Sequence, residues 1–327
     1  AGAGFQIYDP NGNLVTMTFT YPTPTTIDVL YTDAEGSLVT PEKLPFGKGY
    51  SIVEVQAPYG YVLDDTRVYF DVTEDNSSEE SEVTVVKVEK PNMAQKGTIT
   101  VEKTGEVFFG VSVSGGVDES GKELPTIYQP QYEKRGLPGA VYEIVAAEDI
   151  ITPDGTVRNT KGEVVDTVTT DENGVATSRE LYLGKYEVRE LTAPHGMVLN
   201  PEPHSVELVY AGQSVAVTET ATSFENERQK VEISLVKSLE QNDTFGIGAN
   251  GEMKNISFGL FAAEEIVSTS GTSIPADGLI EIITLNEDGT ATVKTDLPLG
   301  SYYVKELATD SHYLLSDTKY PVTFEYA

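Results

Sequence analysis

The sequence contains no cysteine and no tryptophan, and only three of its 327 residues are histidines. Without cysteine the chain can form no disulfide, no thiolate nucleophile and no cysteine-based metal site. His195, His204 and His312 show neither metal-ligand spacing nor a Ser-His-Asp arrangement, so we interpret them as residues of surface loops. We therefore expect no metal, no cofactor and no conventional enzymatic activity.

Basic residues are also scarce, since 22 lysines and arginines stand against 52 aspartates and glutamates, a net charge of −30. Nucleic acids and anionic membrane surfaces both require a basic face, so neither is an expected partner. No run of about 18 apolar residues is present, which excludes membrane insertion by this segment. The chain starts at Ala1 without a signal-peptide pattern, and we interpret it as a piece of a longer protein that is monomeric in solution.

What the sequence does contain is a segment that occurs three times. Its copies are YSIVEVQAPYGYVL from Tyr50, YEVRELTAPHGMVL from Tyr186 and YYVKELATDSHYLL from Tyr302. Each copy carries a glutamate four residues after its first tyrosine. An upstream aromatic precedes that glutamate by 49, 48 and 48 residues, counted from Phe5 to Glu54, Tyr142 to Glu190 and Phe258 to Glu306. Landmarks that keep their separation three times indicate three homologous units.

The local pattern in each unit is that of β-structure. Short runs of Val, Ile, Tyr and Thr alternate with turn dipeptides such as Asn173-Gly174 and Asp288-Gly289. We therefore predict an all-β protein of three tandem Ig-like or prealbumin-like β-sandwich domains in an elongated array. The acidic turns lack the spaced ligand series of a calcium loop, so plain hairpin turns are the preferred interpretation over calcium binding.

The predicted domains cover residues 1–92, 96–228 and 230–327. The first lacks its first strand, and the third ends before its last strand. The second carries an inserted segment near 104–136, and inserted loops often carry binding sites. This segment is therefore our candidate for a recognition surface.

Strand parity in the second unit directs charged side chains toward the core. Lys103 shares a strand face with Ile99 and Val101, and Glu190 shares one with Tyr186. The same alternation turns Asn226 inward. Buried charges normally pair, so one interpretation is a buried Lys–Glu ion pair with a bound asparagine.

The other interpretation is covalent. Burial raises a carboxyl pKa and lowers an ammonium pKa, so a neutral lysine can attack the asparagine amide while the glutamate acts as acid and base. The product is a Lys–Asn isopeptide bond, and folding supplies the effective concentration.

These residues resemble the B-type domains of the collagen-adhesin class, also called SpaA-type or pilin-type domains, of Gram-positive surface proteins. The segment Tyr186–Gly196 fits the Y-x-V-x-E-x-x-A-P-x-G pattern of that class. In the family a first-strand lysine bonds a last-strand asparagine with help from this glutamate, so the resemblance implies these roles for Lys103, Asn226 and Glu190.

The other two units depart from the pattern. Glu54 has no lysine-bearing strand before it, and Glu89 falls about where the asparagine would lie. Lys237 and Glu306 are present in the third unit, but no asparagine follows Glu306. We therefore expect incomplete sites in these two units.

The resemblance implies a structural protein of the extracellular bacterial cell surface: a stalk or backbone segment of a cell-wall-anchored adhesin or pilus. The alternative is an adhesin module that itself binds a host extracellular-matrix protein or a glycan. Neither interpretation makes the chain an enzyme beyond its own autocatalytic bond.

Overall fold

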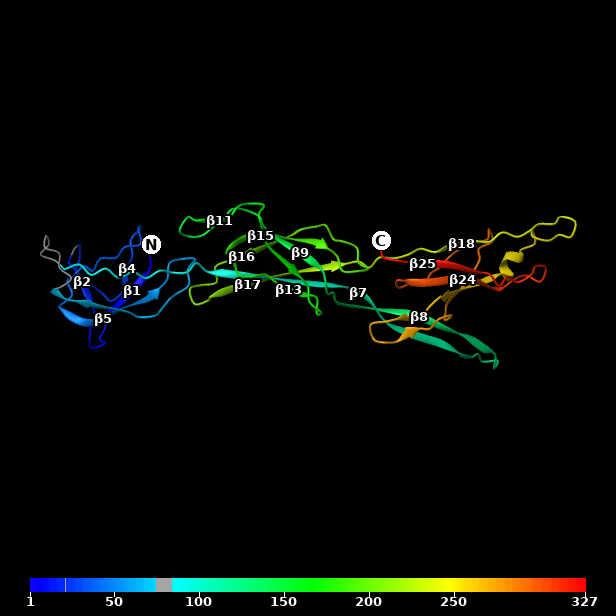
Figure 1. Cartoon of the computed structure of the whole chain (residues 1–327), viewed down its shortest axis with the longest axis horizontal. Helices are drawn as coiled ribbons and strands as arrows, with labels where there is room; N and C mark the ends of the chain where they lie inside the picture. Colours follow the sequence, from blue (N-terminus) through cyan, green and yellow to red (C-terminus); the bar gives the residue numbers. More distant parts are fainter. Residues whose placement is uncertain (21, 75–83) are drawn as a thin grey trace.

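Three antiparallel four-stranded arrays follow one another along an elongated molecule (Figure 1), and the third of them is part of a nine-stranded sheet. The computed structural model describes residues 1–20, 22–74 and 84–327. Their strand orders are β4-β1-β5-β6, β12-β9-β15-β16 and β22-β19-β24-β25. In each array the strand with the upstream aromatic lies next to the strand with the repeat glutamate, so corresponding strands occupy the same positions. We call the predicted domains, residues 1–92, 96–228 and 230–327, units one, two and three. The all-β fold class is confirmed.

The bounds of these strands are as follows: β1 (Gly4–Tyr8), β4 (Leu30–Tyr31), β5 (Gly47–Gln56) and β6 (Val68–Val72) in unit one; β9 (Val141–Ala146), β12 (Val164–Thr169), β15 (Gly184–Thr192) and β16 (His204–Leu208) in unit two; β19 (Ser257–Ala262), β22 (Leu279–Thr284), β24 (Gly300–Ala308) and β25 (Lys319–Phe324) in unit three.

The remaining elements form the facing layers and the connections: β2 (Met17–Phe19), β3 (Thr25–Ile27), β7 (Lys96–Val117), β8 (Glu123–Gly136), β10 (Ile150–Ile151), β11 (Val157–Asn159), β13 (Val175–Thr177), β14 (Leu181–Tyr182), β17 (Val217–Asn226), β18 (Ser234–Val236), the short 3-10 helix η2 (Glu252–Asn255), β20 (Ile266–Val267), β21 (Ser273–Ile274) and β23 (Thr290–Thr292).

The two sequence landmarks meet in space in every unit. The upstream aromatic lies directly across the sheet from the repeat glutamate, in the pairs Phe5–Glu54, Tyr142–Glu190 and Phe258–Glu306. Cross-strand neighbours of this kind have their Cβ atoms only about 5 Å apart. The constant separation in the sequence is therefore the length of chain needed to return to the same point of the sheet.

The first tyrosine of each repeat holds the turn that precedes it. The hydroxyl groups of Tyr50, Tyr186 and Tyr302 donate hydrogen bonds to the backbone carbonyls of Pro45, Tyr182 and Pro298, at 3.0, 2.6 and 2.6 Å. All three rings are buried in the core. Each ring thus fills the core while its polar end finds the partner that a buried hydroxyl requires.

The second layer of unit two is organised around β7. This strand pairs in antiparallel fashion with β13 and β14 on one side and in parallel with β17 on the other. The parallel ladder runs from the Val217–Lys96 pair to the Asn226–Gly105 pair. The first and last strands of unit two are therefore neighbours, and Ile99 and Val101 of β7 are fully buried between the layers.

The inserted segment continues β7 into a long hairpin with β8 that reaches unit three. Leu279 of β22 pairs with Ile127 of β8, and Thr269 and Ser270 donate backbone hydrogen bonds to the carbonyls of Phe108 and Phe109. The insert therefore connects two units, and its role as a recognition surface stays a prediction for the side chains that remain exposed. Phe108, Val111 and Tyr128 pack on unit three. Val113, Val117 and Leu124, nearer the tip of the hairpin, remain exposed to solvent.

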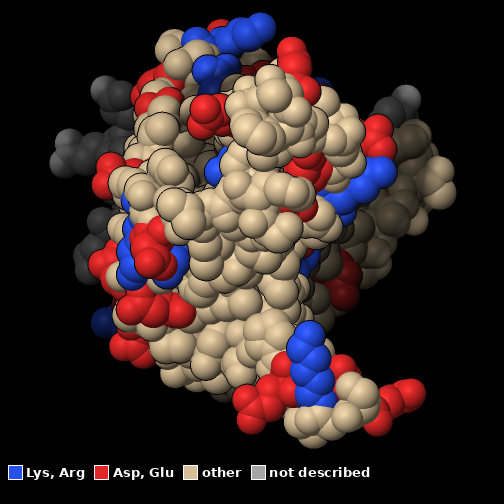
Figure 2. Space-filling model, turned by 90° about the vertical axis from the view of Figure 1, so that its right-hand side faces the viewer, with Lys and Arg blue, Asp and Glu red and all other residues tan. Residues whose placement is uncertain are grey.

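The charged side chains at one end of the molecule are scattered. Figure 2 shows the end of the molecule that unit three forms, where acidic side chains lie mainly around the edges and a broad central area carries no charge. Basic side chains lie among the acidic ones. The negative net charge therefore does not concentrate in one acidic patch on this face.

The contact between the hairpin and unit three supplies a testable prediction. The Arg228 guanidinium, 8% exposed, lies 3.8 Å from the Tyr132 ring centre and forms an ion pair with Asp296. Replacing Arg228 with alanine removes a desolvated cation–π contact and should cost roughly 2 kcal/mol of docking free energy. We expect the orientation of units two and three to become more variable.

Because the chain has no cysteine, two spin labels can be introduced cleanly at the exposed positions Glu148 and Leu314. Pulsed electron paramagnetic resonance should give a broader label-to-label distance distribution for Arg228→Ala. The control Lys134→Ala, which breaks an exposed ion pair with Glu225, should leave it unchanged. Equal widths for Arg228→Ala and the unsubstituted protein would show that this contact does not fix the joint.

Candidate functional site

Three polar side chains from three different strands converge in the core of unit two. Lys103 lies on β7, Glu190 on β15 and Asn226 on β17. The Lys103 Nζ atom is 2.7 Å from Glu190 Oε1, and the Asn226 amide donates to Glu190 Oε2 at 2.9 Å. The lysine and glutamate side chains are 0% exposed and Asn226 is 2% exposed. The structure thus brings together the three residues that strand parity directs inward.

The backbone of unit two fixes this meeting. Lys103 is in register with Phe224, so Asn226 lies two residues further along the same face of β17. Glu190 lies opposite Tyr142 on the facing sheet. Its carboxylate also accepts a hydrogen bond from the backbone N–H of Asn200 at 2.8 Å. The glutamate is therefore held between the lysine and the asparagine.

Aromatic rings exclude water from the site. The Lys103 Nζ atom lies 5.7 and 5.8 Å from the ring centres of Tyr142 and Phe224. The Tyr142 hydroxyl approaches Glu190 Oε1 at 3.4 Å. Burial, and then the nearby Glu190 charge, raise the pKa of Tyr142, so this hydroxyl stays protonated. The site is a closed polar cluster within an apolar core.

Burial acts on the amine in the direction that nucleophilic attack requires. It lowers the pKa of Lys103 from its ordinary value of 10.5, although the contact with Glu190 opposes this effect. The Lys103 Nζ atom lacks a hydrogen bond of good geometry, because its contact with Glu190 is close but poorly directed. The Asn226 Oδ1 atom also has no partner. An unsatisfied buried amine and an unsatisfied buried amide are costly, and a reaction between them would remove part of that cost.

Unit three has two of the three groups. Lys237 Nζ lies 3.1 Å from Glu306 Oε1, and the Ser316 backbone N–H donates to Glu306 Oε2 at 2.9 Å. The glutamate is 1% exposed and the lysine 27% exposed. No asparagine contacts Glu306 in the parts of the chain that the structure describes.

Unit one has a different pair of the three groups. The Asn92 amide donates to both carboxylate oxygens of Glu54 at 2.8 Å, and Glu54 is 0% exposed. The Asp64 backbone N–H donates to Glu54 Oε2 at 3.0 Å, as Asn200 does to Glu190. No lysine contacts Glu54 within residues 1–20, 22–74 and 84–327. Unit one therefore holds the glutamate and the asparagine without the amine.

The expected position of this asparagine was wrong by three residues. Glu89 is exposed and forms an ion pair with Lys87, whereas Asn92 occupies the place that Asn226 has in unit two. The signal for it is in the sequence, because N-x-x-Q-K occurs both from Asn92 and from Asn226. Strand parity alone could not identify Asn92, because the chain between the glutamate and the asparagine is two residues longer in unit one than in unit two.

Other polar groups have ordinary structural roles. The Asp171 carboxylate accepts hydrogen bonds from the backbone N–H groups of Asn173 and Val175, and these bonds lower the pKa of Asp171. Within the described residues no group of three or more His, Asp or Glu side chains could hold a metal ion. No helix among these residues is long and apolar enough to cross a membrane.

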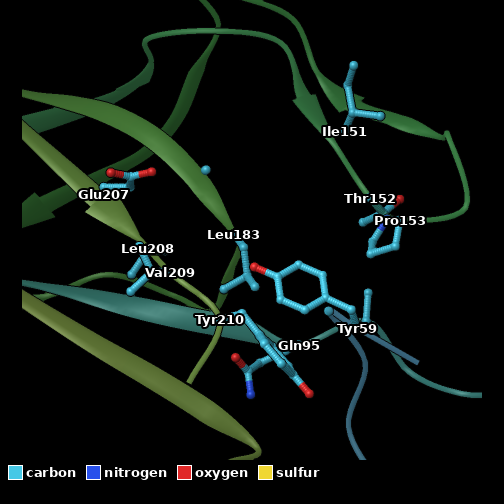
Figure 3. A pocket seen from close by; sticks show the side chains of 13 residues that line it. Tyr59, Gln95, Ile151, Thr152, Pro153, Leu183, Glu207, Leu208, Val209 and Tyr210 are labelled. Carbon is cyan, nitrogen blue, oxygen red and sulfur yellow. The ribbon is translucent and has the colours of Figure 1, made fainter. Parts of the chain in front are cut away.

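A hollow of about 240 Å³ lies at the joint of units one and two. Figure 3 shows Tyr59 beside Tyr210, with Pro153 and Leu183 around them. The Gln95 side chain, 1% exposed, accepts a hydrogen bond from the backbone N–H of Ala211 at 2.9 Å and donates to the carbonyls of Gly212 and Val215. With its amide fully used between the units, this region is a joint and offers no reactive group.

The buried charges give a stability prediction. In an Asn226→Ala background, where no Lys–Asn bond can form, Glu190→Ala should cost about 3–5 kcal/mol because it leaves the Lys103 ammonium buried without a countercharge. Adding Lys103→Met should recover most of that loss. Denaturant unfolding of the three variants measures both effects, and a Glu190→Ala cost below about 1 kcal/mol would contradict a buried pair.

The lowered pKa of Lys103 also predicts how the stability of the Glu190→Ala, Asn226→Ala variant depends on pH. The unfolded state keeps the lysine proton up to about 10.5, whereas the folded state releases it at lower pH, so the unfolded state binds more protons in that window. The stability of the Glu190→Ala, Asn226→Ala variant should therefore rise as the pH approaches 10.5. The matched variant with Lys103→Met should lack this rise.

The three units are similar to known proteins of one family. The family model described as SpaA, prealbumin-like fold domain, matches residues 1–87, 129–222 and 229–326. The trypsin-resistant surface T6 protein of Streptococcus pyogenes serotype M6 is 26% identical over 147 residues, which are 43% of this chain and 26% of that protein. The chain thus spans about a quarter of this curated relative.

A solved structure from Bacillus anthracis shares the fold. The Bacillus anthracis TIE protein matches 99% of this chain with 45% of its own length, at 22% identity and a TM-score of 0.53. BcpA, the major pilin subunit of Bacillus cereus, matches 99% of this chain with 90% of its own, at 17% identity and a TM-score of 0.29. Since the family model covers most of the sequence in three consecutive matches, the chain belongs to the family of SpaA-type prealbumin-like fold domains.

Proposed function

We propose that this chain is a stalk or shaft segment of a bacterial surface protein, and that an isopeptide bond between Lys103 and Asn226 cross-links its second unit. The observation that carries the proposal is the buried meeting of these two side chains on one glutamate, at 2.7 and 2.9 Å. The surface location of the T6 relative supports a place outside the cell, on the bacterial cell wall. The role is structural, with no substrate other than the chain itself.

The reaction balances within the site. The lone pair of Lys103 Nζ attacks Cγ of Asn226, the Cγ–Nδ2 bond breaks, and ammonia leaves. Glu190 contacts both nitrogen atoms, so its Oε1 atom can take a proton from Nζ while its other oxygen supplies one to Nδ2. No oxidant, cofactor or second protein is required. Folding provides the effective concentration because the three strands cannot form the core without bringing the groups together.

The position of the bond suits a protein under tension. β7 opens unit two and β17 closes it, and the two strands run parallel and adjacent. A pull on the chain ends would load β7 from its start and β17 from its end. With Lys103 joined to Asn226, this force passes directly between the strands, so residues 104–225 carry none of it. A disulfide could do the same, but the chain has no cysteine.

The alternative function, binding of a host protein or a glycan, has less support. The inserted segment that motivated it packs along unit three, where the Tyr132 hydroxyl donates to the Asp296 carbonyl at 3.2 Å. The structural function explains the buried cluster of Lys103, Glu190 and Asn226, which has no other evident role. Buried charges are costly and often mark a functional site.

The mass of the intact protein tests the bond. The folded chain should weigh one ammonia less than its sequence, because only unit two has all three groups. Lys103→Arg, Asn226→Ala and Glu190→Ala should each restore the full mass. Since Lys103→Arg keeps the charge beside Glu190 but removes the reactive amine, it is the matched control for a purely ionic role. A well-folded protein with the full sequence mass would refute the bond.

Protease resistance gives an independent readout. We expect unit two to resist trypsin longer than unit two of Lys103→Arg, because the cross-link restricts the unfolded state as a disulfide would, typically by about 2–4 kcal/mol. Fragments can be assigned by mass to residues 96–226. Equal cleavage rates in unit two of both proteins would mean that the bond, if present, does not protect this domain.

A further inference from the structure

Tyr142 is the aromatic residue that lies across the sheet from the repeat glutamate of unit two. Phe5 and Phe258 occupy the same place in units one and three. A tyrosine at this place adds a hydroxyl group that a phenylalanine cannot supply. Unit two is also the unit in which the glutamate contacts both a lysine and an asparagine. The hydroxyl group and the complete set of reacting groups thus occur together.

The Tyr142 hydroxyl shares one oxygen of the Glu190 carboxyl group with the lysine. It donates to Oε1 at 3.4 Å, and Lys103 Nζ lies 2.7 Å from the same atom. The other oxygen, Oε2, accepts hydrogen bonds from the Asn226 amide at 2.9 Å and from the Asn200 backbone N–H at 2.8 Å. One oxygen therefore faces the lysine and the other faces the asparagine, as a proton transfer between their nitrogen atoms requires.

The glutamate of unit one, opposite a phenylalanine, is oriented differently. Both oxygens of Glu54 accept hydrogen bonds from the Asn92 amide, each at 2.8 Å. This carboxylate is therefore turned so that both of its oxygens face the asparagine. The torsion that turns a carboxylate is soft, because χ3 of glutamate has a broad energy profile. The divided arrangement of unit two consequently needs an anchor on the oxygen that faces the lysine.

The glutamate of unit three, also opposite a phenylalanine, has a longer lysine contact. Lys237 Nζ lies 3.1 Å from Glu306 Oε1, compared with 2.7 Å for the pair in unit two. Among the described residues this buried Oε1 atom finds no hydrogen-bond donor of good geometry. A phenol at the place of Phe258 would supply such a donor, as Tyr142 does in unit two.

The position of the Tyr142 hydroxyl is fixed by the ring that carries it. The ring is fully buried, and its centre lies 4.8 Å from that of Phe224. Phe224 is in turn stacked on His204, with ring centres 3.8 Å apart and planes 15° from parallel. Side chains locked by packing in this way can hold a reacting group to within about 0.5 Å.

We infer that Tyr142 is a positioning residue for the bond between Lys103 and Asn226: its hydroxyl holds Glu190 Oε1 on the lysine side and so sets the rate at which the bond forms. This inference rests on the proposed function of unit two. Tyr142 itself neither gains nor loses a proton. Nζ attacks Cγ, the Cγ–Nδ2 bond breaks and ammonia leaves, while Glu190 carries the proton between the two nitrogen atoms.

The test compares rates of bond formation in the full chain. Chains are made in a short cell-free translation pulse, synthesis is stopped, and the loss of one ammonia is followed at low temperature by intact mass after acid quenching. Tyr142→Phe should slow this loss roughly 10- to 100-fold, the scale on which a small misplacement of a reacting group acts. The final mass should be the same as that of the unsubstituted protein.

Tyr186→Phe is the matched control. Tyr186 is also buried in unit two, but its hydroxyl donates to the Tyr182 carbonyl at 2.6 Å and not to Glu190. Its replacement should leave the rate of ammonia loss unchanged and lower the denaturation midpoint of unit two in the unlinked Asn226→Ala background. Tyr142→Phe should leave that midpoint nearly unchanged, since phenylalanine fills the same place in units one and three.

Two tyrosine analogues at position 142 separate hydrogen bonding from packing. 4-Aminophenylalanine keeps a donor in place of the hydroxyl, whereas 4-methylphenylalanine fills a similar volume without a donor. The amino analogue should restore most of the rate that Tyr142→Phe loses, and the methyl analogue should not. Equal rates for the two analogues would overturn the positioning role, because hydrogen bonding would then make no difference.

The bond and the role of Tyr142 fail separately in this experiment. If the unsubstituted chain loses ammonia and Tyr142→Phe loses it at the same rate, the positioning role is refuted while the bond in unit two stands. If the folded, unsubstituted chain never loses ammonia, the bond itself is refuted, and the role of Tyr142 with it.

Discussion

Each unit of this protein is built around a carboxylate buried opposite an aromatic ring. Glu54, Glu190 and Glu306 are at most 6% exposed, and each accepts a backbone N–H from the residue ten positions later. One such hydrogen bond does not offset the desolvation of a carboxylate, so each glutamate needs a further polar partner. The rest of each site follows from how that need is met: by lysine and asparagine in unit two, by lysine in unit three and by asparagine in unit one.

This constraint explains how much of the site could be predicted from the sequence. Period-2 alternation directs Lys103 and Glu190 inward, and the structure places them 2.7 Å apart. Repeat spacing likewise predicted the three homologous units, and the structure shows that the paired landmarks of each unit lie in register. Both predictions use local geometry that tertiary packing cannot easily override. The identity of the amide partner in unit one could not be reached in this way, because the connection before Asn92 differs in length from that before Asn226.

The position of the inserted segment could not be predicted from the sequence for another reason. Its strands read as a hairpin, but whether a hairpin is free or docked depends on surfaces far away in the chain. Here Arg228, at the joint of units two and three, stacks on Tyr132 of the hairpin, and Phe108 and Val111 pack against the core of unit three. The same insert that suggested a binding loop thus docks in part on unit three.

The central claim is that the buried glutamate of unit two promotes a covalent bond and does not merely pair with a lysine. Nuclear magnetic resonance of the protein labelled with ¹⁵N at the lysine side chains distinguishes the two states at the atom concerned. The account predicts that Lys103 Nζ appears as an amide nitrogen bearing one proton, with a signal that disappears in Asn226→Ala. An Nζ that remains an amine or ammonium in the folded, unsubstituted protein would contradict it and leave a buried ion pair.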